Sequence, residues 1–412
     1  MSTTAHGSDS HKKTVSDLAI FGGAPAFENA LHVGRPNIGN RQRFLERVGD
    51  ILERRWLTNG GQYVSQFEKR IAEMVHVEHC VAICNATVGL EIAIRALELK
   101  GEVIIPSFTF IATAHVLQWL KITPVFCDID PKTHCLDPKR LEQLITPQTT
   151  GIIGVHLWGQ ACDIDSLTEI SARRGLRLLF DSAHAFGSSY HGSMIGSFGD
   201  AEVFSFHATK FLNSLEGGAV VTNNAQLAEQ LRLMRNFGFV TYDKTDSIGI
   251  NGKMNEISAA MGLTNLESVE EFIALNREHY QHYRERLSDL DGISLLTFNE
   301  DERSNYQYVV LEVDEQKTGL ARDQLMQILH AENVLARRYF YPGCHDMEPY
   351  KSLYSDAHLL LPLTERLAAR VLTLPTGQAI TAEMIDRICT IIQTALENAS
   401  EVQNMLEERR LA

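Results

Sequence analysis

The sequence predicts an α/β protein built on a mostly parallel seven-stranded sheet with helices on both faces. Between about residues 78 and 222, short apolar runs alternate with stretches whose apolar residues recur at helical spacing, such as "ATVGLEIAIRALEL" at 86–99. Buried strands that alternate with helices form parallel sheets in which both faces are covered. The seven runs are "CVAIC" (80–84), "EVIIP" (102–106), "TPVFCD" (123–128), "GIIGVH" (151–156), "LRLLFD" (176–181), "AEVFSF" (201–206) and "GAVVT" (218–222).

The pattern changes after about residue 256 and predicts a second, smaller α+β domain. "NEISAAMGLTNLESVEEFIALNREHYQHYRERL" is typical of one long helix or of two in succession. The elements expected after it are an alternating strand at 306–314, a helix at 322–332, an apolar segment at 334–342 and an amphipathic helix at 382–397.

These patterns divide the chain into three parts. We expect a disordered tail over residues 1–16, a large domain with an N-terminal segment over 17–270, and a small C-terminal domain over 271–412. The tail, "MSTTAHGSDSHKKTVS", is polar and lacks the apolar segment of a signal peptide.

Composition excludes several classes of partner. The 412 residues hold 38 Lys and Arg against 52 Asp and Glu, a net charge of −14, which argues against nucleic acid and against a polybasic membrane patch. No apolar run approaches the ~18 residues of a membrane span. The seven cysteines are scattered and form no CxxC pair, as in a reducing compartment. We therefore expect a cytoplasmic protein with no metal site.

Ligands of such sheets bind beyond the carboxyl ends of the strands, and several of these ends carry polar residues. Asp181 ends one strand and precedes "SAHAFG", where it could be a helix N-cap or the partner of a buried cation such as a protonated pyridine nitrogen. Lys210 follows the next strand along the chain, and a lysine in apolar surroundings has a lowered pKa and can bond to an aldehyde. The pair fits pyridoxal phosphate, although any α/β protein offers Asp and Lys at strand ends.

Three further stretches could hold the rest of such a cofactor. The amides of Ala86 and Thr87 begin a helix, where an anion is stabilised, although the same "NAT" also fits a simple N-cap. Ser205 could add a hydroxyl to the phosphate site. Phe110, in "PSFTF", could lie on a heteroaromatic ring or belong to the core. The common alternatives, GxGxxG and GxxxxGK[ST], are both absent from the sequence.

From about residue 20 almost to its C-terminus, the chain resembles the DegT/DnrJ/EryC1/StrS family of sugar aminotransferases, which are fold-type I pyridoxal-phosphate enzymes. The resemblance rests on the order and spacing of its motifs. They are "LTNGG", "CNATVGLEIAIRAL", "PSFTFIATAHVL", "PVFCDID", "VHLWGQACDID", "FDSAHAFG", "IGSFGDAEVFSFHATKFLNSLEGGAVVTNN", "LRLMRNFGF", "NGKMNEISAAMGL" and "YFYPGCH".

The resemblance implies a role for each candidate residue. Lys210 would be the lysine that binds the cofactor covalently, Asp181 would pair with the pyridinium, and Phe110 would stack on the ring. Ala86, Thr87 and Ser205 would bind the phosphate.

Two positions need separate comment. Asn251 would reach the phosphate of a neighbouring subunit, which implies a homodimer with shared active sites. His184 stands where many relatives have Gln, and would still hydrogen-bond the phenolic oxygen of the cofactor.

The implied reaction transfers an amino group from L-glutamate, through pyridoxamine phosphate, to C4 of a nucleotide-linked 4-keto-6-deoxy sugar. The stretches "VHLWG", "DAEVFSFHATK" and "RNFGF" look closest to the enzymes that act on dTDP-4-keto-6-deoxyglucose, the activity classified as 2.6.1.33. Amination at C3 or of another sugar, dehydration, and a non-catalytic regulator that binds the cofactor are the alternatives. Relatives that dehydrate replace the lysine with His, so Lys210 favours transamination.

A nucleotide sugar carries a pyrophosphate, whereas this chain is acidic overall, so cationic or polar side chains must gather at the mouth of the site. Lys253, His345 and Tyr341 are the candidates, and for each a structural role is an equal alternative.

Overall fold

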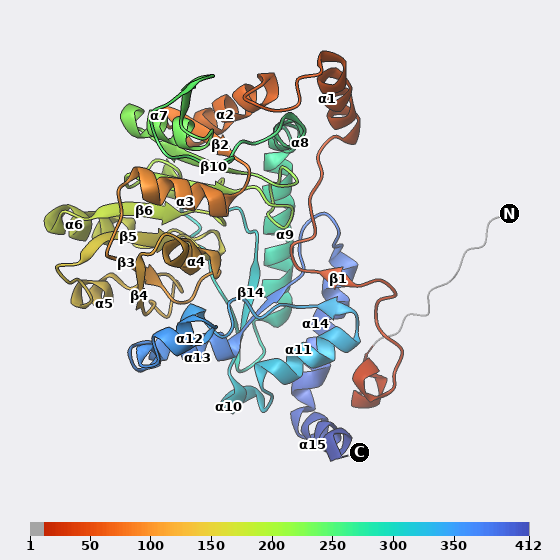
Figure 1. Ribbon diagram of the computed structural model, residues 1–412. Coiled ribbons are helices and arrows are strands. Elements are labelled where there is room, and N and C mark those ends of the chain that lie inside the picture. The colour runs from red at the N-terminus through yellow and green to blue at the C-terminus, as the bar shows by residue number, and fades with distance from the viewer. Residues whose placement is uncertain (1–11, 412) are drawn as a thin grey trace.

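The computed structural model of the protein describes residues 12–411. Figure 1 shows the long helix α9 (Val269–Leu287) running between the large sheet and the C-terminal region. Residues 1–11 of the predicted tail (1–16) lie outside the described residues.

A seven-stranded sheet forms the centre of the larger part, in the order β2-β10-β9-β6-β5-β3-β4. Its strands are β2 (His79–Ile83), β3 (Glu102–Pro106), β4 (Thr123–Cys127), β5 (Thr149–Val155), β6 (Arg177–Asp181), β9 (Ala201–Ser205) and β10 (Gly218–Thr222). β10 runs antiparallel to both of its neighbours, and the other pairs of adjacent strands are parallel. The predicted mostly parallel seven-stranded sheet is confirmed.

Alternate residues of each strand enter two different cores, as a sheet covered on both faces requires. Along β6, Leu178 and Phe180 pack in one core and Leu179 in the other. The helices of the large part are α1 (Arg41–Arg54), α2 (Gln62–Val75), α3 (Ala86–Ala96), α4 (Ala112–Trp119), α5 (Pro138–Gln143), α6 (Ile164–Arg174), α7 (Ala225–Met234) and α8 (Glu256–Leu266). Residues of α3, α4 and α7 share one core, and residues of α2, α6, α8 and α9 share the opposite one.

The C-terminal part has its own antiparallel sheet in the order β13-β14-β16. Its elements are β13 (Ile293–Leu295), β14 (Val309–Val313), α10 (Glu315–Thr318), α11 (Arg322–Ala331), β15 (Val334–Leu335), α12 (Tyr350–Leu353), α13 (Pro362–Arg370), β16 (Val371–Leu374), α14 (Ala382–Glu397) and α15 (Ala399–Leu411). The expected helices at 322–332 and 382–397 correspond to α11 and α14. The long helical pattern after residue 256 is two helices, α8 and α9. The boundary expected between residues 270 and 271 stays a prediction.

The N-terminal segment packs on the C-terminal core, which the sequence did not indicate. Val15 and Leu18 are buried beside residues of β14 and α14, and β1 (Leu31–His32) pairs in parallel with β15. Residues 12–16, which we assigned to a tail, are therefore in place, because Val15 and Lys12 are both buried.

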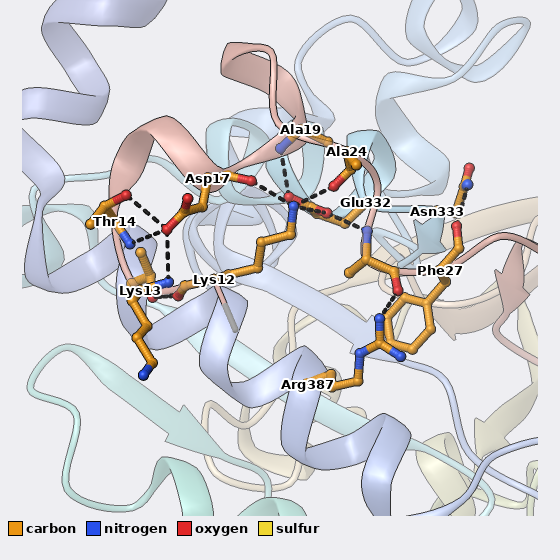
Figure 2. A network of polar contacts seen from close by, with 12 residues as sticks. Lys12, Lys13, Thr14, Asp17, Ala19, Ala24, Phe27, Glu332, Asn333 and Arg387 are labelled. Atoms are coloured by element: carbon orange, nitrogen blue, oxygen red, sulfur yellow. Dashed lines mark hydrogen bonds and ion pairs between the residues drawn. The ribbon is translucent and has the colours of Figure 1, made fainter. Parts of the chain in front are cut away.

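Figure 2 shows the polar cluster that fixes this segment. The Glu332 carboxylate accepts hydrogen bonds from the backbone N–H groups of Ala19 and Ala26, each at 2.7 Å. Lys12 lies 3.2 Å from the same carboxylate and donates to the carbonyls of Asp17 and Ala24. Each oxygen of Glu332 thus has a backbone donor, and the Lys12 ammonium has three acceptors.

Two other findings concern the sequence expectations. Over residues 12–411, no helix is long and apolar enough to cross a membrane. All seven cysteines are free. The cytoplasmic location stays a prediction.

Candidate active site

A cavity of about 490 Å³ lies beyond the carboxyl ends of β5, β6 and β9, next to the start of α3. It is lined by Asn85, Ala86, Thr87, Val88, Leu90, Thr109, Phe110, Ala112, Val155, Asp181, Ala183, His184, Ser205, His207, Thr209, Lys210, Glu216, Tyr308, Tyr339 and Phe340. The structure therefore brings together seven of the predicted residues: Ala86, Thr87, Phe110, Asp181, His184, Ser205 and Lys210.

Asp181 ends β6 and is 6% exposed. Its Oδ2 accepts a hydrogen bond from the Thr113 hydroxyl at 2.8 Å, and its Oδ1 accepts one from the backbone N–H of Ala183 at 3.2 Å. Burial raises the pKa of this carboxyl above its usual range, and the Thr113 hydrogen bond acts in the opposite direction. A carboxylate desolvated in this way gains most from a cationic partner inside the cavity.

Lys210 lies on the loop between β9 and β10. Burial lowers the pKa of its amine to about 8, and the Asp181 charge partly opposes that shift. Among the hydrogen bonds of residues 12–411, none is made by its Nζ. A lysine without an acceptor and with a lowered pKa is a good nucleophile toward a carbonyl carbon.

The first turn of α3 faces the same cavity. Asn85 caps the helix, and its side chain accepts only from the N–H of Val88 at 2.9 Å, so the amides of Ala86 and Thr87 stay free for a ligand. Gly218 on β10 lies against this turn, since a Cβ there would be 2.7 Å from the Ala86 nitrogen. The turn thus provides a place for a phosphate, with Ser205 at the end of the adjacent β9.

His184 lies on the aromatic side of the cavity. Its ring is stacked on Phe340, with ring centroids 5.8 Å apart, and its Nε2 lies 3.5 Å from the Tyr308 hydroxyl. Burial, and then the nearby Lys210 charge, hold the pKa of this imidazole well below its usual range, which favours the neutral ring.

Phe110 lies at the mouth of the cavity and is more than half exposed. Its ring packs edge-on against Phe340, with the ring centroids 6.4 Å apart. An exposed ring among the lining residues can stack on a planar ligand. This arrangement differs from the core alternative for the residue.

Comparison with known proteins identifies the family of this chain. The model of the DegT/DnrJ/EryC1/StrS aminotransferase family matches residues 39–393. The chain belongs to this family.

Individual relatives narrow the resemblance. The chain is 35% identical to dTDP-4-amino-4,6-dideoxy-D-glucose transaminase of Shigella dysenteriae over 366 residues, which is 89% of this chain and 99% of that protein. It is 34% identical to GDP-perosamine synthase of Caulobacter vibrioides, over 89% of this chain and 98% of that one. Among solved structures, DesI in the presence of its TDP-sugar product shares 48% identity at a TM-score of 0.91, covering 96% of this chain and all of the other.

Pyridoxal phosphate is the cofactor of this family, and the cavity fits it. The site offers one desolvated acid, one amine with a lowered pKa, an open helix start and exposed aromatic faces. These match a pyridinium, an aldehyde, a phosphate and a planar ring respectively.

Four predicted residues do not line the cavity. Lys253 lies with its Nζ 4.8 Å from the Phe237 ring centroid, and Asn251 pairs with Asn236 on the exposed side of the chain. Tyr341 is half-exposed beneath the Arg338 guanidinium, at 4.2 Å. A contact of Lys253, Asn251 or Tyr341 with ligands stays a prediction.

His345, the fourth of these residues, is buried away from the cavity lining. It is 3% exposed, and its Nδ1 lies 2.7 Å from the Ser107 hydroxyl, which also accepts from the His345 backbone N–H. This mutual contact links two loops, and a contact of His345 with the substrate stays a prediction.

The sequence missed several lining residues. Tyr308, Tyr339 and Phe340 come from the C-terminal part, and no local pattern connects them with the strand ends. Thr113 lies on α4, four residues after Thr109, and only its distance to Asp181 shows its importance.

Proposed function

We propose that this protein transfers an amino group from L-glutamate to C4 of a dTDP-linked 4-keto-6-deoxy sugar, most simply dTDP-4-keto-6-deoxyglucose. The product would be the 4-amino-4,6-dideoxy sugar. The observation that carries the proposal is the joint presence of Asp181 and Lys210 in one cavity with a free helix start.

The bound cofactor supplies a carbonyl carbon that carries the amino group and a ring that accepts negative charge. The Asp181 carboxylate holds a proton on the ring nitrogen, and Thr113 and Ala183 fix its orientation. Lys210 would accept a proton from the carbon that bears the amino group and return it to the carbonyl carbon of the cofactor, on the other side of the nitrogen, for which a pKa of about 8 is well placed. Ala86, Thr87 and Ser205 anchor the phosphate.

The choice of sugar nucleotide is supported by the relatives. The transaminase of Shigella dysenteriae and DesI are named for dTDP or TDP sugars, whereas the 34%-identical protein of Caulobacter vibrioides is named for a GDP sugar. Tyr341 and Lys253 are the candidates for contact with the nucleotide part.

We further propose a homodimer in which Asn251 of one subunit completes the phosphate site of the other. Asn251 follows the hairpin of β11 (Phe239–Thr241) and β12 (Lys244–Thr245), which projects many apolar side chains. Tyr242 is fully exposed and Ile248 is 78% exposed, and such a surface is typical of an interface. The matched control for an Asn251→Ala variant is Asn299→Ala, which changes an amide beyond the cavity lining.

The direct test is a panel of keto sugars carried by dTDP, UDP or GDP, each incubated with the purified protein and L-glutamate. We expect turnover with the dTDP-4-keto-6-deoxy sugar, and NMR of the product identifies the aminated carbon. Amination at C3, or turnover only with a GDP sugar, would replace this proposal with the corresponding one.

A second experiment tests whether the bound cofactor reacts with the amino donor. The visible absorbance of the bound cofactor should bleach when L-glutamate is added. Bound cofactor that never bleaches would indicate a regulator.

A further inference from the structure

The aromatic side of the cavity is connected to the C-terminal sheet by a continuous hydrogen-bonded chain. Trp158 is fully buried and lies in the short helical turn Leu157–Gly159 that follows β5. Its ring is stacked on Phe340 at 5.4 Å, and its plane is nearly parallel to that of His184. It does not line the cavity, yet both of its N–H groups are bonded to histidines.

The indole N–H of Trp158 determines which nitrogen of His134 carries the hydrogen. Indole Nε1–H can only donate, and it lies 3.1 Å from Nδ1 of His134, so that nitrogen is an acceptor. The His134 hydrogen is therefore on Nε2, which lies 3.1 Å from the Glu312 carboxylate on β14. Every donor along this part of the chain has an acceptor.

The backbone N–H of Trp158 determines which nitrogen of His184 carries the hydrogen. The Trp158 backbone N–H points to Nδ1 of His184 at 3.4 Å, so this nitrogen also accepts. A neutral ring with an acceptor at Nδ1 carries its hydrogen on Nε2, and that atom lies beside the Tyr308 hydroxyl at 3.5 Å.

Trp158 holds this position with an unusual backbone. Its φ is +62°, a left-handed conformation that is uncommon for a bulky side chain. Such a strained conformation persists only where neighbouring contacts hold it in place. The hydrogen bond from the indole to His134 is one of these contacts.

We propose that Glu312, His134 and Trp158 are positioning residues that hold His184 as a neutral imidazole with its hydrogen on Nε2, facing Tyr308. Glu312 orients His134, His134 holds the Trp158 ring, and Trp158 presents its amide to His184. The inference deepens the proposed function because His184 lines the same cavity. The first test, however, requires neither cofactor nor turnover.

The test uses full-length protein labelled with ¹⁵N in histidine and tryptophan, with and without pyridoxal phosphate. A His184→Gln sample identifies the His184 signals by their loss. We expect a protonated Nε2 and an unprotonated Nδ1 for His184. A hydrogen on Nδ1 would overturn the proposal.

Hydrogen exchange at the Trp158 indole tests the remaining hydrogen bonds, from Trp158 to His134 and Glu312. Of the three tryptophans, Trp56 and Trp119 are 57% and 78% exposed and serve as internal references for the buried Trp158. We expect Glu312→Ala to accelerate exchange of the Trp158 indole hydrogen roughly tenfold, about the effect of one lost hydrogen bond of ordinary strength. Unchanged exchange in a folded variant would contradict the role of Glu312.

Two further variants make the result specific. Glu312→Gln keeps an oxygen at the same place, so it should retain most of the protection, and it also serves if Glu312→Ala does not fold. Asp386→Ala removes the carboxylate from a second His–carboxylate contact, His282 to Asp386 at 3.0 Å, which has no link to the cavity. It should leave both the Trp158 exchange and the His184 signals unchanged.

Failure of this inference and failure of the proposed function can be told apart. If sugar turnover is absent but the His184 signals are as expected, only the proposed function fails. In the holoenzyme, the pH at which the visible cofactor band titrates should move in Glu312→Ala and not in Asp386→Ala. A merely structural loss would not produce that difference.

Discussion

Two combinations of lysine and carboxylate within residues 12–411, Lys12 with Glu332 and Lys210 with Asp181, are built in opposite ways. Lys12 and Glu332 saturate each other: the carboxylate also receives two backbone N–H groups, and the ammonium also reaches two carbonyls (Figure 2). Lys210 and Asp181 line an open cavity, where the aspartate has two hydrogen-bond donors and the lysine amine has no acceptor among residues 12–411.

The difference distinguishes a structural ion pair from a reactive site. A buried charge with complete partners fixes a segment, here the N-terminal one, on the second core. A buried charge with incomplete partners shifts its pKa toward the neutral form, as both Asp181 and Lys210 do. A ligand can then supply what is missing, which the saturated pair does not need.

The largest expected effect is at the open pair. Lys210→Ala should lower turnover by at least about a thousandfold, because it removes the group that moves the proton. The free energy of unfolding should change little, since the amine makes no hydrogen bond within residues 12–411 and its burial is itself unfavourable. Steady-state rates and denaturant unfolding measure the two quantities, and Lys69→Ala on the exposed face of α2 is the control. Full turnover without Lys210 would contradict the assignment.

At the saturated pair the effect should fall on stability instead. Glu332→Ala leaves two backbone N–H groups without an acceptor and the buried Lys12 charge without its carboxylate, and should lower the free energy of unfolding by about 3–5 kcal/mol. Urea unfolding measures this. Asp291→Ala breaks the exposed contact between Lys317 and Asp291 and should cost less than about 1 kcal/mol. An equal loss of unfolding free energy in the two variants would contradict a structural role for the buried contact between Lys12 and Glu332.

A smaller effect is expected for the residue that supports Asp181. Thr113→Val removes the hydroxyl that donates to Oδ2, so the pKa of Asp181 should rise further, because that hydrogen bond lowers it. A weaker hold on the ring proton should reduce turnover by about tenfold or somewhat more, the range for a hydrogen bond to a charged group. Thr113→Ser keeps the hydroxyl and should stay close to the unchanged protein in a pH–rate profile.

The smallest effect is a shift along the pH axis. With the pKa of Lys210 at about 8, the free amine increases about tenfold per pH unit below pH 8 and levels off above it. The rate at which the cofactor-free protein binds pyridoxal phosphate should follow this curve. Because the Asp181 charge raises the pKa of Lys210, Asp181→Asn should move the midpoint to lower pH. A midpoint that moves upward would contradict the electrostatic coupling.

The sequence predicted the elements that local patterns encode. All seven strands were placed within about two residues, because each is a short apolar run between helices. Asp181 and Lys210 could be brought together in advance, since strand ends share one edge of a parallel sheet.

Contacts between distant segments could not be predicted. Lys12 and Glu332 are 320 positions apart, and nothing in "HKKTVS" distinguishes a buried lysine from a solvated one. Phe340 and Tyr308 reach the cavity only because the C-terminal sheet packs beside it. His345 belongs to the motif "YFYPGCH", but its burial against Ser107 depends on how two loops meet.

The antiparallel direction of β10 has a consequence for how this site can vary. The loop that carries Lys210 leaves β9 and returns at once to the neighbouring strand, where Gly218 pairs with Ser205. Two further backbone bonds, Phe206 to Gly217 and Ser214 to Phe206, tie its ends together. Phe211 and Leu212, which directly follow Lys210, are buried, so the loop is packed into the fold as well as closed at its ends. A change in the length of this loop would therefore move Lys210 itself, so variation is better tolerated elsewhere around the cavity.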